Sequence, residues 1–200
     1  DEKIENLQAE TGEQTDRVPA HPECDGTSFV VAKEQYGTTV DMDALISKIK
    51  QSITEFASTL DMMDEGCYVM PKYTSDSPEV QAACDEMNTY LKASITYPMD
   101  ENIVVDKDLI SEWVTYDDDM NVTLDEDAVR AWMREFGSKY DTVGTTRSLT
   151  TPTGKSAQVS GGTYGWSVAE DKETEKLINS IKKGEVAERA PEYNQTAASH

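Results

Sequence analysis

The sequence predicts an α+β fold in which short antiparallel sheets and β-hairpins pack with about five amphipathic helices. Three observations lead to this prediction. Apolar residues recur every three or four positions in several segments, as in helices with one buried face. Short runs rich in β-branched residues separate these segments. An aliphatic residue is followed by aspartate at Val40-Asp41, Val105-Asp106 and Leu124-Asp125, where a strand would end and a capped helix would begin.

The first predicted helix begins after Asp41. A short strand at residues 29–31, a turn at Tyr36-Gly37 and a second strand at residues 38–40 precede it. The apolar residues of this helix are spaced by three or four positions, and we expect the stripe to face a core: Leu45, Ile49, Ile53, Phe56 and Leu60. The helix should end within residues 61–66.

The central part of the chain continues the same alternation. A strand at residues 67–70 should end at Pro71, because proline has no amide hydrogen to give to a sheet. Ser77-Pro78 predicts the start of a helix, and residues 95–97 and 103–105 predict a pair of strands. The two helices of this part should bury these stripes: Val80, Cys84, Met87 and Leu91, then Val129, Trp132, Met133, Phe136 and Tyr140.

A glycine-rich segment follows the aromatic helix. Gly144 should end that helix, and residues 145–151 are β-rich. Residues 157–160 and 163–168 alternate in phase about Gly161-Gly162, which predicts a hairpin with a two-residue turn. No Gly-Lys-Ser/Thr follows Gly161-Gly162, so we do not expect a phosphate-binding loop at that turn. A last helix over residues 170–183 should end at Gly184, and residues 189–193 should form an extended exit.

The domain organisation follows from composition. Residues 1–26 are polar and contain Pro19 and Pro22, which predicts an arm or linker in which His21 is solvated. Residues 27–193 form the structured region, either one core or two lobes meeting near residues 113–119.

Charge limits the classes of partner. The net charge of −21 and the pI near 4.3 give a surface that repels phosphate backbones and anionic lipids. We therefore expect neither nucleic-acid binding nor membrane contact by this chain. No run of about 18 apolar residues and no signal peptide is present, which predicts a soluble fragment or a mature chain without its targeting segment.

Candidate metal sites and catalytic sites are weak. Asp117, Asp119 and Asn121 match the first positions of a calcium loop, but Val122 stands where glycine is needed and Ala128 where glutamate is needed. A surface turn between a helix and a strand is the better interpretation, and no metal or cofactor is expected. The acidic residues mostly suit helix caps, so an enzyme of the carboxylate-pair type is not favoured.

Cys24, Cys67 and Cys84 lack the spacing of a metal site, and an odd number of cysteines cannot pair completely. Two alternatives remain open for the last two: a Cys67–Cys84 disulfide, or separate buried thiols.

One set of motifs resembles a known family. These are Tyr140-Asp141-Thr142 with Gly144 and Arg147, the Thr-Pro-Thr-Gly segment ending at Gly154, Gly-Gly-Thr-Tyr-Gly-Trp ending at Trp166, and Arg189-x-Pro191-x-Tyr193. Together they resemble the peptidoglycan-binding domain that precedes the catalytic domain in Gram-positive L,D-transpeptidases. Gly37 to Leu45, Tyr68-x-x-Pro71, Asn88-x-Tyr90-Leu91 and Ile95-Thr96-Tyr97 are similar too.

The resemblance implies a non-catalytic, extracellular and cell-wall-associated module. It would bind peptidoglycan and position a covalently linked C-terminal catalytic domain, in a parent protein anchored to the membrane at its N-terminus. The family's catalytic cysteine stands in a Ser-His-Gly-Cys segment, which Ser199-His200 does not supply. Residues 194–200 would begin the linker to the catalytic domain. The alternative is a structural spacer without ligand affinity.

The candidate binding residues are Tyr164 and Trp166 as stacking surfaces for glycan or stem peptide, and Arg147 as a partner for a carboxylate. A structural role competes with each of these assignments. The two rings could form the core of the hairpin, and Arg147 could pair with Asp141.

Overall fold

The computed structural model describes residues 14–160 and 162–197 of the 200-residue chain. These residues form five helices and several short sheets, which confirms the predicted α+β class. The chain divides into two compact units. Unit 1 comprises the residues up to Glu23 together with Val30–Cys84, and unit 2 comprises Cys24–Phe29 together with the residues from Asp85 onward. No helix in the described part of the chain has the length and apolar character needed to cross a membrane.

The division between the units lies within helix α3 (Pro78–Tyr90), not near residues 113–119. Trp113 and Val114 belong to the hydrophobic core of unit 2, where they are 5% and 7% exposed. A boundary at this point would have split a single buried cluster.

Unit 1 contains ordered structure in part of the predicted polar arm. Val18 and Gln35 exchange backbone hydrogen bonds of 2.9 and 2.8 Å, and the Ala20 amide donates to Tyr73 at 3.0 Å. Strands β1 (His21–Cys24) and β2 (Phe29–Ala32) form a two-stranded sheet. The expected arm is therefore wrong from residue 14, because these amides pair with segments distant in sequence. Residues 1–13 lie outside the described part of the chain.

Helix α2 (Met42–Thr54) starts where the sequence predicts, with the Asp41 carboxylate accepting from the Ala44 amide at 2.9 Å. Its predicted buried stripe is wrong beyond the first turns. Leu45 is 4% exposed, whereas Ile53 is 59% and Phe56 is 94% exposed. The helix ends at Thr54, and Phe56 takes a left-handed backbone angle (φ 54°), so Phe56 does not continue the helical stripe.

The two strands expected on either side of α2 are each reduced to one residue. Val40 and Tyr68 form an isolated antiparallel bridge, and the Asp41 amide donates to the Cys67 carbonyl at 2.8 Å. Two backbone segments therefore meet here without a continuous ladder.

Cys67 and Cys84 are buried thiols, and no disulfide joins them. Of the two alternatives left open by the sequence, the structure therefore has separate thiols. The backbone hydrogen bonds of Cys67 hold it beside the turn at Met62, while Cys84 lies on α3, so each cysteine is placed by its own element. Burial raises the pKa of the Cys67 thiol, which keeps it protonated and unreactive.

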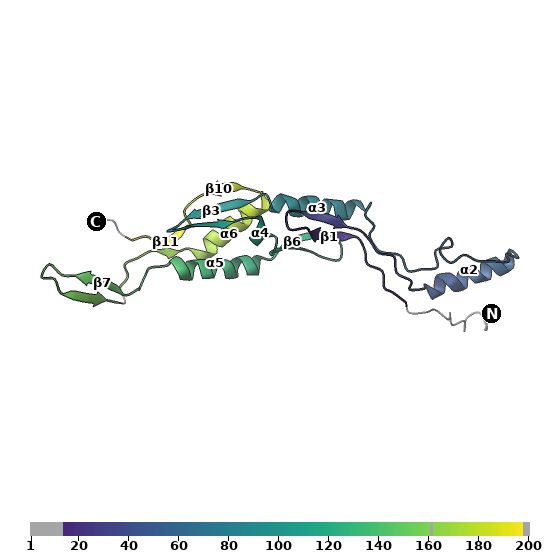
Figure 1. Ribbon diagram of the computed structural model, residues 1–200, viewed down its shortest axis with the longest axis horizontal. Coiled ribbons are helices and arrows are strands. Elements are labelled where there is room, and N and C mark those ends of the chain that lie inside the picture. The colour runs from purple at the N-terminus through teal and green to yellow at the C-terminus, as the bar shows by residue number, and fades with distance from the viewer. Residues whose placement is uncertain (1–13, 161, 198–200) are drawn as a thin grey trace. The chain divides into compact units, whose positions relative to one another are not determined.

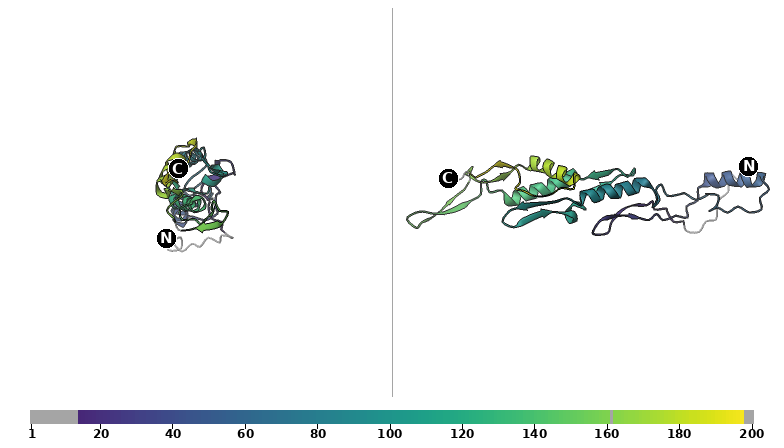
Figure 2. Two further views of the ribbon diagram at one scale, coloured as in Figure 1. Left: turned by 90° about the vertical axis from the view of Figure 1, so that its left-hand side faces the viewer. Right: turned by 90° about the horizontal axis from the view of Figure 1, so that it is seen from above.

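Unit 2 is built on a three-stranded sheet in the order β10-β3-β4. β3 pairs antiparallel with β4 as predicted, and parallel with β10. Helices α5 and α6 lie side by side, and α6 also contacts β3 (Figures 1 and 2). The remaining bounds are β3 (Ser94–Pro98), β4 (Asn102–Val105), α4 (Lys107–Ile110), β5 (Val114–Tyr116), β6 (Val122–Leu124), α5 (Glu126–Tyr140), β7 (Arg147–Thr150), β8 (Ser156–Val159), β9 (Ser167–Val168), α6 (Glu170–Lys182), β10 (Val186–Glu188) and β11 (Tyr193–Gln195).

The predicted aromatic stripe of α5 packs into the core of unit 2. Val129 and Met133 are fully buried, and the Phe136 ring lies 5.1 Å from that of Tyr97. Trp132 and Tyr140 are only partly buried, at the margin of the core. Val129, Met133 and Phe136 therefore form part of the core, whereas Trp132 and Tyr140 remain accessible to solvent.

A buried ion pair crosses this core. Glu173 on α6 is fully buried, and its Oε1 atom accepts from the Tyr97 hydroxyl at 2.7 Å and from Arg189 Nη2 at 3.1 Å. Its Oε2 atom accepts from the Glu192 amide at 2.8 Å. The segment after β10, predicted only as an extended exit, is thus fixed to α6 and β3 by one carboxylate.

The hairpin predicted about Gly161-Gly162 is wrong. β8 pairs antiparallel with β7, with Arg147 opposite Val159 and Thr150 opposite Ser156. The turn between them uses Gly154 (φ 77°). The Thr-Pro-Thr-Gly segment ending at Gly154 therefore forms the turn of the β7–β8 hairpin. β9, the other half of the predicted hairpin, pairs with β11. Gly161 lies outside the described residues.

The acidic turn at residues 117–121 joins strands β5 and β6, rather than a helix and a strand. The Asp117 carboxylate accepts from the amides of Asp119 and Asn121, both at 2.9 Å. Within the described ranges, no group of three or more metal-binding side chains is arranged to hold an ion.

Two buried tyrosines predict a loss of stability at alkaline pH. Burial raises the pKa of Tyr90 from 10.0 to about 12, and the Glu86 carboxylate that accepts its hydroxyl adds to the rise. Burial and then Glu173 also raise the pKa of Tyr97. Because the folded state holds these protons more tightly, the stabilisation is fully present below about pH 10 and falls as the pH rises towards about 12.

We expect Tyr90→Phe to lose less stability than the unaltered chain between about pH 10 and about 12, measured by urea denaturation. Tyr36→Phe is the control, because Tyr36 is 52% exposed. Equal pH dependence in Tyr90→Phe and the unaltered chain would contradict the assignment.

Candidate ligand-binding cleft

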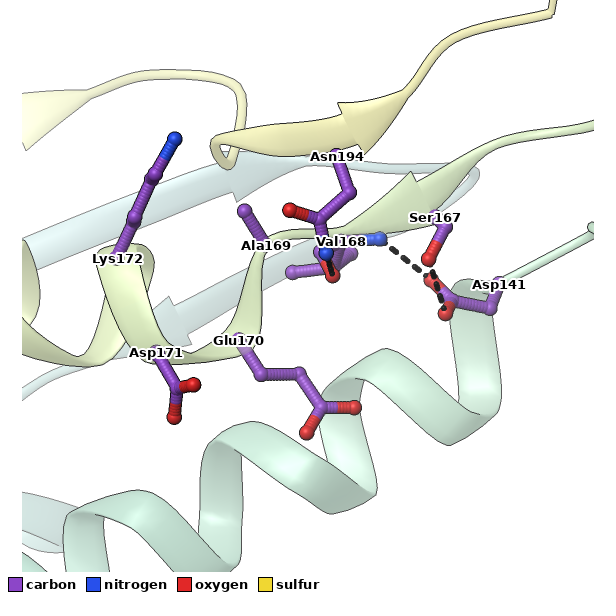
Figure 3. Close-up of a pocket in the computed structure, with 8 residues that line it drawn as sticks. All are labelled: Asp141, Ser167, Val168, Ala169, Glu170, Asp171, Lys172 and Asn194. Atoms are coloured by element: carbon purple, nitrogen blue, oxygen red, sulfur yellow. Dashed lines mark hydrogen bonds between the residues drawn. The ribbon is translucent and has the colours of Figure 1, made fainter.

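The end of α5 is fixed to strand β9 by one side chain. The Asp141 carboxylate accepts from the Val168 amide at 2.8 Å and from the Ser167 hydroxyl at 3.2 Å. Figure 3 shows both bonds, with Asp141 pointing from the end of α5 towards β9. The Tyr140-Asp141-Thr142 motif is therefore a junction between a helix and a sheet.

Thr142 continues this junction by binding the backbone of Trp166. The Thr142 amide donates to the Trp166 carbonyl at 2.9 Å, and the Trp166 amide donates to the Thr142 hydroxyl at 2.9 Å. Gly165 has φ 142°, and a Cβ atom there would lie 2.5 Å from the Thr142 carbonyl carbon. Only glycine allows this close approach, so Gly165 helps to fix the backbone from which the Trp166 side chain projects.

The Trp166 ring borders an open pocket of about 370 Å³, which we call the aromatic cleft. The ring is 41% exposed and meets the Tyr193 ring edge-on, with centroids 4.9 Å apart at 65°. Burial, and then the Asp141 carboxylate, raise the pKa of the Tyr193 hydroxyl above its usual value. The cleft is lined by Pro98, Met99, Asp100, Tyr140, Thr142, Trp166 and Tyr193.

Arg147 and Tyr164 contact each other beside this junction. The Arg147 guanidinium carbon lies 4.5 Å from the centroid of the Tyr164 ring, and Nη2 donates to the Thr142 carbonyl at 3.5 Å. The alternative role for Arg147, a pair with Asp141, is not formed: Arg147 contacts Tyr164 and Thr142, and the Asp141 carboxylate bonds to β9. The Tyr164 ring is 47% exposed, so neither it nor Trp166 forms the core of a hairpin. Arg147 and Tyr164 are not among the residues that line the aromatic cleft.

A second, smaller pocket of about 170 Å³ lies along α5. Tyr140 lines both this pocket and the aromatic cleft. Lys139 Nζ lies 5.1 Å from the centroid of the Tyr140 ring. The second pocket is lined by Ile103, Trp132, Glu135, Phe136, Lys139 and Tyr140.

A third pocket, polar and about 340 Å³ in volume, lies at the start of α6 (Figure 3). Several of its polar side chains make contacts within the protein: Asp141 bonds to β9, Asp171 lies 3.6 Å from Arg130, and the Asn194 amide donates to the Val168 carbonyl at 3.3 Å. We therefore assign this pocket a structural role.

The C-terminal segment contributes to the site. Besides Tyr193 in the cleft, the Gln195 side-chain amide donates to the carbonyls of Thr163 and Gly165. Residues 193–195 thus belong to the folded unit as strand β11, whereas residues 198–200, including Ser199-His200, lie outside the described part.

Sequence reasoning missed Tyr140, Tyr193 and the β3–β4 turn as cleft residues. Tyr140 and Tyr193 each stand in a motif that suggested the family, and this could have singled them out. Nothing in the local sequence of residues 98–100 indicates that they meet these rings.

Comparisons with known proteins agree with the motifs. A family model described as "Putative peptidoglycan binding domain" matches residues 73–188, more than half of the chain. No curated protein matches.

Two solved structures are similar over part of their length. One is described as "Structure of the Ldtfm-avibactam carbamoyl enzyme", at 29% identity over 58% of this chain and 47% of that chain, with a TM-score of 0.47. The other is a mutant of the Enterococcus faecium L,D-transpeptidase, at 30% identity over 56% of this chain and 46% of that chain, with a TM-score of 0.46. The chain thus spans about half the length of each. On the match to residues 73–188, the chain belongs to the peptidoglycan binding domain family.

Proposed function

We propose that this chain is a non-catalytic module that binds peptidoglycan in the cell wall through the aromatic cleft. The observation that supports the cleft as the site is the placement of Trp166. Its backbone is fixed by hydrogen bonds to Thr142 and by the close approach at Gly165, yet its ring is 41% exposed. A rigid, accessible aromatic ring loses little conformational entropy on binding a ligand.

The environments of Cys67 and His21 support recognition rather than catalysis. Cys67 is buried with its thiol pKa raised, so it is a poor nucleophile. His21 Nδ1 lies 2.9 Å from the Pro19 carbonyl, in contact with its own backbone segment. A cysteine nucleophile needs a thiolate beside a base, and these environments do not provide one at Cys67 or His21.

The wider setting is part of the same proposal. The parent protein would be an extracellular Gram-positive L,D-transpeptidase with an N-terminal membrane anchor, and its cysteine nucleophile would lie in a C-terminal catalytic domain outside this chain. In that setting, the module would hold the catalytic domain close to the stem peptides that it cross-links. The similarity of residues 73–188 to a peptidoglycan binding domain supports the assignment.

Co-sedimentation with purified Gram-positive sacculi tests the proposal. We expect saturable binding by the unaltered chain and a loss of about tenfold in affinity, or about 1.4 kcal/mol, for Trp166→Ala. Trp166→Phe should retain part of the affinity, because it keeps an aromatic face.

Phe56→Ala is the matched control, since it removes a 94% exposed ring from unit 1. It should bind as the unaltered chain does. The alternative function, a spacer without ligand affinity, predicts no saturable binding by any of these proteins, and that result would overturn the proposal.

A further inference from the structure

Resting on the proposed function, we propose that the aromatic cleft and the second pocket together bind two successive sugar rings of the glycan strand. The peptidoglycan ligand of the site is then the saccharide rather than the stem peptide. The starting observation is that the two pockets meet at one side chain, Tyr140.

The two pockets present a run of aromatic rings. Tyr140 follows Phe136 with ring centroids 5.0 Å apart, and Phe136 stacks on Trp132 at 5.5 Å and 22°. In the aromatic cleft, Trp166 and Tyr193 form the edge-on pair. The C–H bonds on the face of a pyranose ring carry slight positive charge and pack favourably on the negative face of an aromatic ring.

Each pocket also offers one carboxylate. Asp100 lines the aromatic cleft and Glu135 lines the second pocket, and both are exposed. Carboxylate oxygens accept hydrogen bonds from sugar hydroxyls and from the N–H of an acetamido group. Apolar walls with a few polar groups are typical of small-molecule sites. A sugar ring bound in either pocket would contact aromatic side chains and one carboxylate.

Charge argues against the stem peptide as the ligand of these pockets. In the aromatic cleft, the carboxyl groups of a stem peptide would meet Asp100 with no lysine or arginine among the described lining residues, on a chain whose net charge is −21. The second pocket carries Lys139 beside Glu135, so the repulsion arises in the aromatic cleft. Arg147 lines neither pocket and instead stacks on Tyr164. A neutral N-acetylated sugar avoids this repulsion.

The shared Tyr140 makes a prediction about ligand length. A single ring can occupy one pocket, whereas a linear oligosaccharide can occupy both, so affinity should rise by about tenfold or more from one sugar ring to a short oligomer. Trp166→Ala should remove most of that rise, because Trp166 lines only the aromatic cleft. Tyr140→Ala should weaken binding of the oligomer most.

Isothermal titration of the full 200-residue chain tests the inference with three probes. These are N-acetylglucosamine and its short oligomers, glycan strands freed of peptide by an amidase, and free stem peptides. We expect binding of the oligomers and the glycan strands, with no saturable binding of the peptides. Tyr36→Ala, which removes a 52% exposed ring in unit 1, should leave every affinity unchanged.

The outcomes separate this inference from the proposed function. Binding of sacculi and stem peptides without binding of glycan strands overturns the saccharide assignment and leaves peptidoglycan binding in place. Absence of binding to sacculi overturns both. Because Tyr140 packs against the core, Tyr140→Ala could disturb the fold, and near-ultraviolet circular dichroism checks this. Trp166→Ala is the second variant, since it alters an exposed residue and tests the same cleft.

Discussion

Glu173→Ala is expected to destabilise unit 2 by roughly 3–5 kcal/mol, because it leaves one side of a buried ion pair without its partner. Glu173 is fully buried, and the Arg189 side chain is 15% exposed. The substitution removes the acceptor of the Tyr97 hydroxyl, of the Arg189 guanidinium and of the Glu192 amide. Three donors would lose an acceptor at once, around a carboxylate that is fully buried.

Urea denaturation followed by tryptophan fluorescence measures this effect. Trp113, Trp132 and Trp166, the three tryptophans of the chain, all lie in unit 2, so the signal reports that unit. Glu175→Ala, an exposed position on the same helix, is the matched control and should change stability by less than about 0.5 kcal/mol. A loss below about 1 kcal/mol for Glu173→Ala would show that the ion pair contributes little.

Gly165→Ala is expected to cost roughly 1–3 kcal/mol of stability and to weaken binding of sacculi by about tenfold, as Trp166→Ala does. The glycine has φ 142°, and a Cβ atom at this position would lie 2.5 Å from the Thr142 carbonyl carbon, 2.6 Å from the Thr142 oxygen and 2.6 Å from the Val143 amide. These are backbone atoms, so a shift in a side chain cannot relieve the overlap. The Thr142–Trp166 hydrogen bonds would break, and the indole ring would lose its position in the cleft.

Gly162→Ala is the control from the same segment, since among the described residues a Cβ there comes within 4.0 Å of the Tyr164 amide alone. It should keep both stability and binding. The two readouts are urea denaturation and co-sedimentation with sacculi. Normal binding by Gly165→Ala would mean that the position of Trp166 is not fixed by this close approach.

Elements whose signals are local could be predicted from the sequence. Asp41, Asp106 and Asp125 each accept an amide of the following helix, as predicted, since a cap involves residues two or three positions apart. The α5 stripe and the Gly184 ending were likewise correct, with Gly184 at φ 63°. The family was also accessible from sequence, because its motifs are short runs of residue types.

The pairing of the strands depended on contacts between distant segments. Residues 157–160 alternate equally well with either neighbour, and β8 pairs with β7 while β9 pairs with β11. A period of two gives the faces of a strand and not its partner. Phe56 failed for another reason: its helical spacing predicted burial, but α2 ends at Thr54 and the residue is 94% exposed.

The candidate site shows the same division. Sequence reasoning selected Trp166, Tyr164 and Arg147, but it could not place Trp166 against Tyr193 or bring Tyr140 and residues 98–100 to the same cleft. Nor could it find that Glu173, one acid among many on a charged chain, is buried against Arg189. Local chemistry determines caps, turns and residue types, whereas a cleft or a buried ion pair depends on long-range packing between elements.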